Sequence, residues 1–90
     1  MRIWCKIMQG NHLIKDTVIE NRDPDMTRTV KVYDALEKAC YELDLEKPMW
    51  LDKNKRDFIR HARTRFDQDN FIEEITFDYL DFQVIEKDLF

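Results

Sequence analysis

The stretch that decides the fold is RIWCKIMQGNHLIKDTVIE, residues Arg2–Glu20. Two runs rich in strand-forming residues, Arg2–Met8 and His12–Glu20, lie on either side of Gly10-Asn11, which contains the only glycine of the chain. A two-residue loop that begins with glycine is typical of a type II′ turn between antiparallel strands. The stretch therefore predicts a β-hairpin at the start of the chain.

The next segment, Met26–Leu45, predicts the main helix, because its apolar residues recur at steps of three and four. Asp23 with Pro24, Asp25 and Thr27 are alternative residues for capping its N-terminus. The apolar stripe should pack against a sheet, as core-facing helices do. Its members are Met26, Val30, Tyr33, Leu36, Cys40 and Leu43, with Ala35 and Ala39 alongside.

Two further elements follow a short link around Pro48, which disfavours helix at the residue before it. Asp52 is placed to cap a second helix that runs through the basic segment. The tail, residues 71–90, contains the longest strand candidate. Its alternation of apolar residues changes phase near Tyr79–Asp81, which favours a β-bulge there over a strand that is apolar on both faces.

Together these elements predict an α+β fold in a single domain, residues 1–90. A small, three-stranded, largely antiparallel sheet consists of the N-terminal hairpin and the long C-terminal strand. One main helix and a shorter second helix pack on it. Ninety residues leave little room for a second domain.

The composition excludes several classes of protein. A single glycine excludes a glycine-rich phosphate loop. The N-terminus does not resemble a signal peptide, and no apolar run approaches the roughly 20 residues of a spanning helix. We therefore expect a cytoplasmic protein without membrane contact. Cys5 and Cys40 match no metal or redox spacing, so buried reduced thiols are expected rather than a disulfide.

Charge is strongly segregated along the chain. Residues 53–65 carry six basic groups and one acidic group, and residues 66–90 carry one basic group and eight acidic groups. The candidate binding residues are the basic ones and the histidine among them: Lys53, Arg56, Arg60, His61, Arg63 and Arg65. On a continuous helix, four of them would form one stripe, and an aromatic stripe of Phe58, Ile59, Ala62 and Phe66 would lie beside it.

Three interpretations of the basic segment remain open. The segment can pair internally with the acidic residues that follow it, as charged runs usually do. It can contact an acidic protein partner, including a second copy of the chain. It can also bind the phosphates of a nucleic acid, with Trp50, Phe58 or Phe66 stacking on bases, although a sequence pI near 5.1 argues against that role.

The sequence thus favours a small binding or regulatory protein that acts through protein contact or self-association, with nucleic-acid binding as the alternative. An enzyme ranks third, with neutral His61 as a general base beside an arginine that holds an anion. Asp23–Asp25 and Asp67–Asn70 lack the further ligands of a calcium loop. No cofactor and no metal site are therefore predicted.

Overall fold

The computed structural model describes residues 1–88. Two strands, β1 (Arg2–Gln9) and β2 (His12–Glu20), form the predicted hairpin. Gly10 has φ of 59° and Asn11 is not among the residues with positive φ, as a type II′ turn requires. The hairpin prediction is therefore confirmed, and the glycine is needed where the chain reverses.

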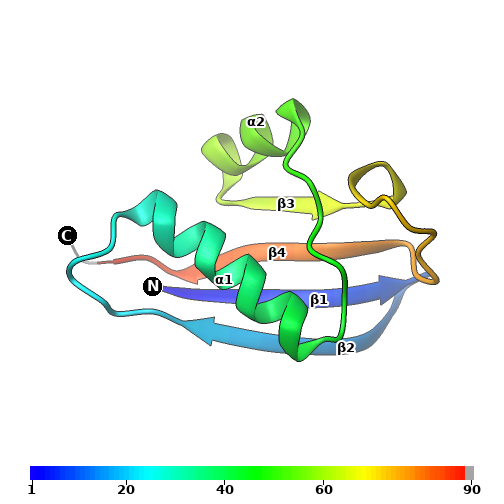
Figure 1. The fold of residues 1–90 in the computed structure, drawn as a ribbon, viewed down its shortest axis with the longest axis horizontal. Coiled ribbons are helices and arrows are strands. Elements are labelled where there is room, and N and C mark those ends of the chain that lie inside the picture. The colour runs from blue at the N-terminus through cyan, green and yellow to red at the C-terminus, as the bar shows by residue number, and fades with distance from the viewer. Residues whose placement is uncertain (89–90) are drawn as a thin grey trace.

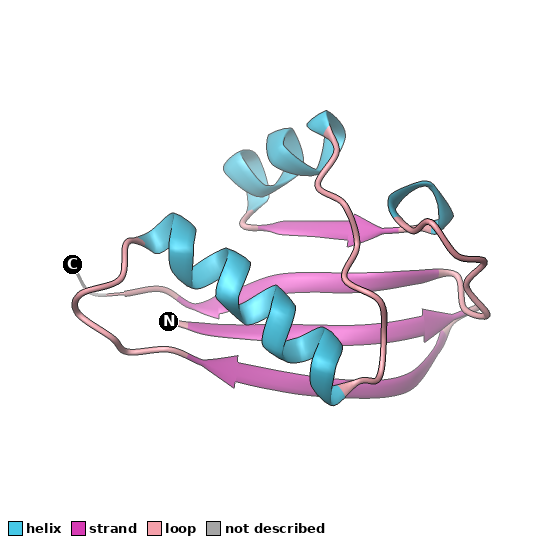
Figure 2. Ribbon diagram, in the orientation of Figure 1, coloured by secondary structure: helices cyan, strands magenta, loops and turns pink. Residues whose placement is uncertain are grey.

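The sheet has four antiparallel strands in the order β2-β1-β4-β3 (Figures 1 and 2). The two additional strands are β3 (Arg63–Phe66) and β4 (Tyr79–Glu86). The prediction of three strands is wrong by one, because β3 lies within the segment that was expected to be helical. A short 3₁₀-helix, η1 (Gln68–Asn70), follows β3.

The tail strand begins later than the sequence predicted. Residues 71–78 form an irregular loop, whose Phe71 and Phe77 still pack on or against the core. The change of phase near Tyr79–Asp81 marks the start of β4 rather than a bulge. The irregularity in the pairing of β4 with β1 lies at the other end, between Arg2 and Ile3. Residues 89 and 90 of the predicted tail lie outside the described residues.

The main helix, α1 (Arg28–Glu42), and the second helix, α2 (Asp52–His61), both lie on one face of the sheet. Figure 1 shows α1 crossing the hairpin, while α2 lies beside β3. Thr27 caps α1 by accepting a hydrogen bond from the Val30 amide (3.2 Å), which settles the three alternatives. Asp52 is the first residue of α2 rather than its cap, which is Leu51.

The core lies between the helices and the sheet. Ile3, Cys5 and Ile7 of β1 face it together with Leu80 and Phe82 of β4. From α1 it receives Val32, Ala35, Leu36, Ala39 and Cys40, whereas Val30 and Tyr33 of the predicted stripe are about half exposed. No helix formed by residues 1–88 lies on the opposite face of the sheet.

Candidate functional site

The basic segment divides between two elements, so the predicted helical stripe is wrong. Lys53, Arg56 and Arg60 lie on α2, whereas Arg63 and Arg65 lie on β3. The break occurs at Ala62, whose backbone is left-handed (φ 53°, ψ 32°) and whose amide bonds to the Phe58 carbonyl (2.9 Å). A left-handed residue ends a helix and redirects the chain.

The predicted aromatic stripe is also divided between α2 and β3. Ile59 is 85% exposed, while Phe66 is completely buried on the helix-facing side of β3. Phe66 and Phe58 both contact Trp50 edge-on, with ring centroids 5.1 and 5.6 Å apart. Phe66 belongs to the core, with Trp50 and Phe58 partly buried against it, so the expected stacking of bases on Phe66 is not available in this fold.

Part of the basic segment pairs with the acidic tail. Lys53 contacts Asp67 at 3.0 Å, with Asp69 at the 4.0 Å limit of an ion pair. Arg63 donates from Nε to Oδ1 of Asp81 (3.0 Å) and from Nη2 to Oδ2 (2.5 Å). Hydrogen bonding to Asp81 raises the pKa of Arg63, although burial opposes the shift. For these two residues the structure supports internal pairing.

Asp81 is the central charged residue of the uncovered sheet face. It is only 1% exposed, and Lys6 of the neighbouring strand lies 3.5 Å away on the side opposite β3. A buried carboxylate is tolerated when it is paired and hydrogen-bonded, as it is here. Its role is thus to join β1, β4 and β3 through two cations.

The remaining basic residues of the segment form no ion pairs with the described part of the acidic tail. Lys55, Arg56 and Arg60 are exposed and form no ion pair with any described residue. Arg65 stacks on the Tyr79 ring, 4.4 Å from its centroid, and Lys6 stacks on Trp4 at 4.0 Å. His61 is the exposed last residue of α2.

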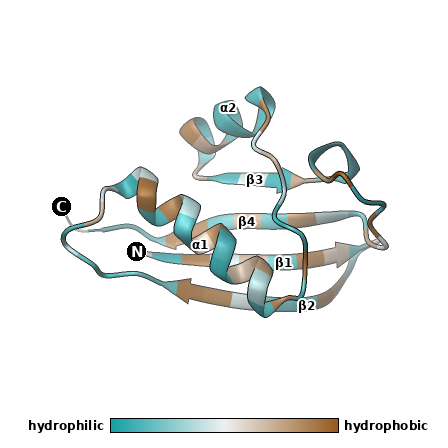
Figure 3. Cartoon of the chain, in the orientation of Figure 1, coloured by the Kyte–Doolittle hydropathy of each residue, from teal (hydrophilic) through white to brown (hydrophobic). Residues whose placement is uncertain are grey.

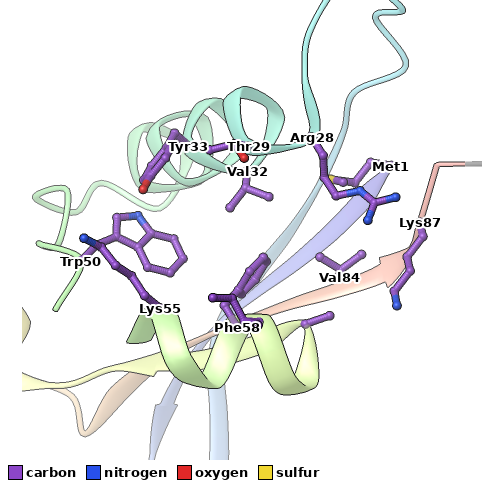
Figure 4. Close-up of a pocket in the computed structure, with 12 residues that line it drawn as sticks. Met1, Arg28, Thr29, Val32, Tyr33, Trp50, Lys55, Phe58, Val84 and Lys87 are labelled. Atoms are coloured by element: carbon purple, nitrogen blue, oxygen red, sulfur yellow. The ribbon is translucent and has the colours of Figure 1, made fainter. Parts of the chain in front are cut away.

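An apolar cavity of about 510 Å³ opens between the two helices (Figure 4). Val32 of α1, Phe58 of α2 and Val84 of β4 line it, with Trp50 from the link between the helices. Three cations stand at its rim. These are Arg28, Lys55 and Lys87, which lie far apart in the sequence and meet only in the tertiary fold.

Strand β2 forms one free edge of the sheet and is exposed along most of its length. Leu13, Ile14 and Val18 are 46%, 56% and 42% exposed. Figure 3 shows hydrophobic residues along this outer strand. An exposed edge strand presents unpaired backbone groups on which a further strand can pair.

Chemical groups for catalysis are sparse. Among residues 1–88, no group of three or more His, Cys, Asp or Glu residues could hold a metal ion. Both cysteines are buried and unbridged. Burial raises the pKa of Cys5 well above its usual range and that of Cys40 to about 11, so neither thiol is a nucleophile at neutral pH.

A scan of protein-family models, a search of curated proteins and a search of solved structures each found no match. In the described part of the chain, no helix has the length and apolar character needed to cross a membrane. The fold and its surfaces are therefore the basis for any functional conclusion.

Proposed function

We propose that this chain is a protein-binding module that acts through the free edge of β2, and that its partner is a second copy of the chain. The observation that carries the proposal is the exposed, nine-residue edge strand with three apolar side chains. Pairing two such edges would extend the sheet across a two-fold axis, which is the commonest symmetry of homo-oligomers.

The backbone of β2 has hydrogen-bonding groups available for such a partner. Asn21 and Met1 exchange two backbone bonds, of 2.9 and 3.0 Å. In an antiparallel ladder the inward and outward directions alternate along the strand. Ile19 and Thr17 therefore bond towards β1, whereas the amides and carbonyls of Asp16 and Val18 point away from the sheet.

Charge selects the register of the pair. With Thr17 on the two-fold axis, Asp16 of each copy lies opposite Val18 of the other, and no like charges face one another there. With Val18 on the axis, Asp16 would lie opposite Glu20 twice, and with Asp16 on the axis, two Asp16 carboxylates would meet. Like charges directly opposite in a sheet are destabilising, so the register centred on Thr17 is favoured.

Sedimentation equilibrium at rising protein concentration tests the proposal. The wild-type chain should associate to a dimer. Val18→Glu would place two carboxylate pairs across the axis and should weaken the dimer about 30-fold, from roughly 1 kcal/mol for each pair. Val18→Lys should retain dimers, because its ammonium would face Asp16.

Ile59→Glu is the matched control, since it puts the same charge on an exposed isoleucine of α2, outside the sheet edge. It should leave the association unchanged. A wild-type chain that stays monomeric at millimolar concentration would refute the proposal. Equal weakening by Val18→Glu and Val18→Lys would refute the register.

Titration of the wild-type chain with nucleic acid tests the alternative function. Lys55, Arg56 and Arg60 are the cations of the basic segment that would have to carry it, because Lys53 and Arg63 are occupied by carboxylates and Arg65 stacks on Tyr79. Three exposed cations without a stacking ring give weak, salt-sensitive binding at most. We expect no saturable binding of labelled single- or double-stranded DNA or RNA at physiological salt.

A further inference from the structure

The cavity between α1 and α2 combines an apolar interior with a rim of one charge. Val32, Phe58, Val84 and Trp50 supply its walls, and no acidic side chain lines it. Its volume of about 510 Å³ lies within the range of small-molecule sites. A pocket of this size and composition suits one small ligand rather than a length of polypeptide.

The cations stand at two ends of the cavity. Figure 4 shows Arg28 and Lys87 near one another on one side, while Lys55 lies with Trp50 on the other. All three side chains are exposed, and none forms an ion pair or side-chain hydrogen bond with a described residue. Nothing within residues 1–88 neutralises them.

The carboxylate that follows Lys87 in the sequence is already engaged. Asp88 accepts bonds from the Met1 ammonium (2.7 Å) and from Lys31 (2.9 Å). These bonds lower the pKa of Asp88 to about 2, so it stays charged and paired at neutral pH. Arg28 is the first residue of α1, and the first turn contains no acidic residue, so the positive end of the helix dipole adds to the cations.

Trp50 supplies the reporter for this cavity. Its indole Nε1 is buried and has no hydrogen-bond partner among the described residues. A buried donor without a partner costs roughly 1–3 kcal/mol, and such groups are rare in native structures. Trp50 also forms part of the cavity wall, so the signal of its indole N–H reports on a ligand bound there.

We propose that this cavity binds a small amphipathic organic anion, with its apolar body between the helices and its carboxylate or phosphate between Arg28 and Lys87. The apolar body contacts Phe58, Val84 and Val32. The anionic group exchanges its water for two charge-assisted hydrogen bonds, which are stronger than neutral ones. The site is independent of the β2 edge, since no residue of that strand lines the cavity.

Decanoate is a suitable probe, and decan-1-ol is the matched neutral compound. The readout is the indole N–H signals in a proton–nitrogen NMR spectrum, assigned with Trp4→Phe. Trp50 lies in the cavity and Trp4 on the opposite, uncovered face, so one spectrum contains both the reporter and the control. Decanoate should shift the Trp50 signal saturably and leave the Trp4 signal in place, and decan-1-ol should bind about tenfold more weakly or worse.

Arg28→Ala with Lys87→Ala should weaken decanoate binding about tenfold or more and leave the affinity for decan-1-ol unchanged. The matched control is Arg56→Ala with Arg60→Ala, which removes two exposed cations of α2 that do not line the cavity. This control variant should bind decanoate with the affinity of the wild type. None of the four side chains makes a described hydrogen bond, so the variants should fold normally.

Three results would overturn the proposal. The first is that decanoate at 5-fold excess over millimolar protein causes no saturable shift of the Trp50 signal. The second is that decanoate and decan-1-ol bind with roughly equal affinity. The third is that the variant with Arg28→Ala and Lys87→Ala binds decanoate as tightly as the wild type. A chain that fails to dimerise but binds decanoate would refute only the proposed function. A chain that dimerises without binding decanoate would refute only this inference.

Discussion

At the residue scale, two buried asparagines join the second half of the chain. Asn54 and Asn70 are both fully buried, and the Asn70 amide donates to Oδ1 of Asn54 (2.7 Å). Asn54 also accepts from the Leu51 amide (3.1 Å) and donates to Thr64 Oγ1 and the Arg65 carbonyl, both at 2.9 Å. All of its hydrogen-bonding capacity is therefore used in connecting α2, β3 and η1.

Asn54→Ala should lower the free energy of unfolding by about 2–4 kcal/mol, because it leaves several buried donors and acceptors without partners. Urea denaturation followed by circular dichroism measures the change. Arg56→Ala, two positions along α2 at an exposed site, is the control and should stay within about 0.5 kcal/mol of the wild type. A loss below 0.5 kcal/mol for Asn54→Ala would contradict the role given to the network.

The sequence did not reveal this network. Asn54 lies within the segment KNKR and looks like one more solvated polar residue of a charged helix. Its burial depends on β3 and η1 lying beside α2, and those contacts arise only from the tertiary fold. The hairpin glycine was predictable, and Thr27 was one of three candidate caps, because turns and caps act on their immediate sequence neighbours.

At the element scale, two helices end at residues other than glycine in a left-handed conformation. Asp44 (φ 57°) follows α1, where Leu45 donates to the Cys40 carbonyl (2.8 Å), and Ala62 (φ 53°) follows α2. The left-handed conformation favours glycine strongly. Since neither position has one, the sequence carried no signal that α2 stops at His61, and the strand after it was assigned to the helix.

A faint signal for β3 was nevertheless present. Arg63, Thr64, Arg65 and Phe66 alternate in direction, so that Thr64 and Phe66 are buried and the arginines lie on the opposite face. Four residues are too few for that alternation to outweigh the helical period of the longer segment. The start of β4 was misplaced for a related reason, because apolar residues of the preceding loop pack like those of a strand.

Ala62→Gly and Asp44→Gly should each raise the free energy of unfolding by about 0.5–1 kcal/mol, since glycine adopts the left-handed conformation without steric cost. Arg56→Gly in the interior of α2 is the control with the opposite sign and should lower it by up to about 1 kcal/mol. Thermal unfolding of the three variants makes the comparison. A loss of stability in both left-handed variants would contradict the conformations described.

At the scale of the whole molecule, the sheet has one face covered by helices and one face and edge without such cover. The covered face follows from hydrophobic patterning, which predicted the α+β class, the hairpin and the main helix. A free sheet edge was expected from the strand count, but its identity as β2 was not, because exposure of Leu13, Ile14 and Val18 depends on which strand pairs with β1 on each side. The acidic tail proved to neutralise part of the basic segment, which moves attention from that segment to β2.

The central claim is that β2 pairs with its own copy around Thr17. In that register the two Thr17 residues lie directly opposite one another as a non-hydrogen-bonded pair. The Cα atoms of such a pair are about 4.5 Å apart, which is within reach of a disulfide. Thr17→Cys is the direct test, and Ile59→Cys on exposed α2 is its control. Both cysteine variants are made in a Cys5→Ala background, because Cys5 is the cross-strand partner of Thr17 and its thiol would otherwise compete for the new cysteine.

Mild oxidation followed by non-reducing electrophoresis gives the result. The account predicts that Thr17→Cys forms covalent dimers rapidly and nearly completely, while Ile59→Cys forms them slowly. Dimer formation by Thr17→Cys that is no faster than by Ile59→Cys would contradict it.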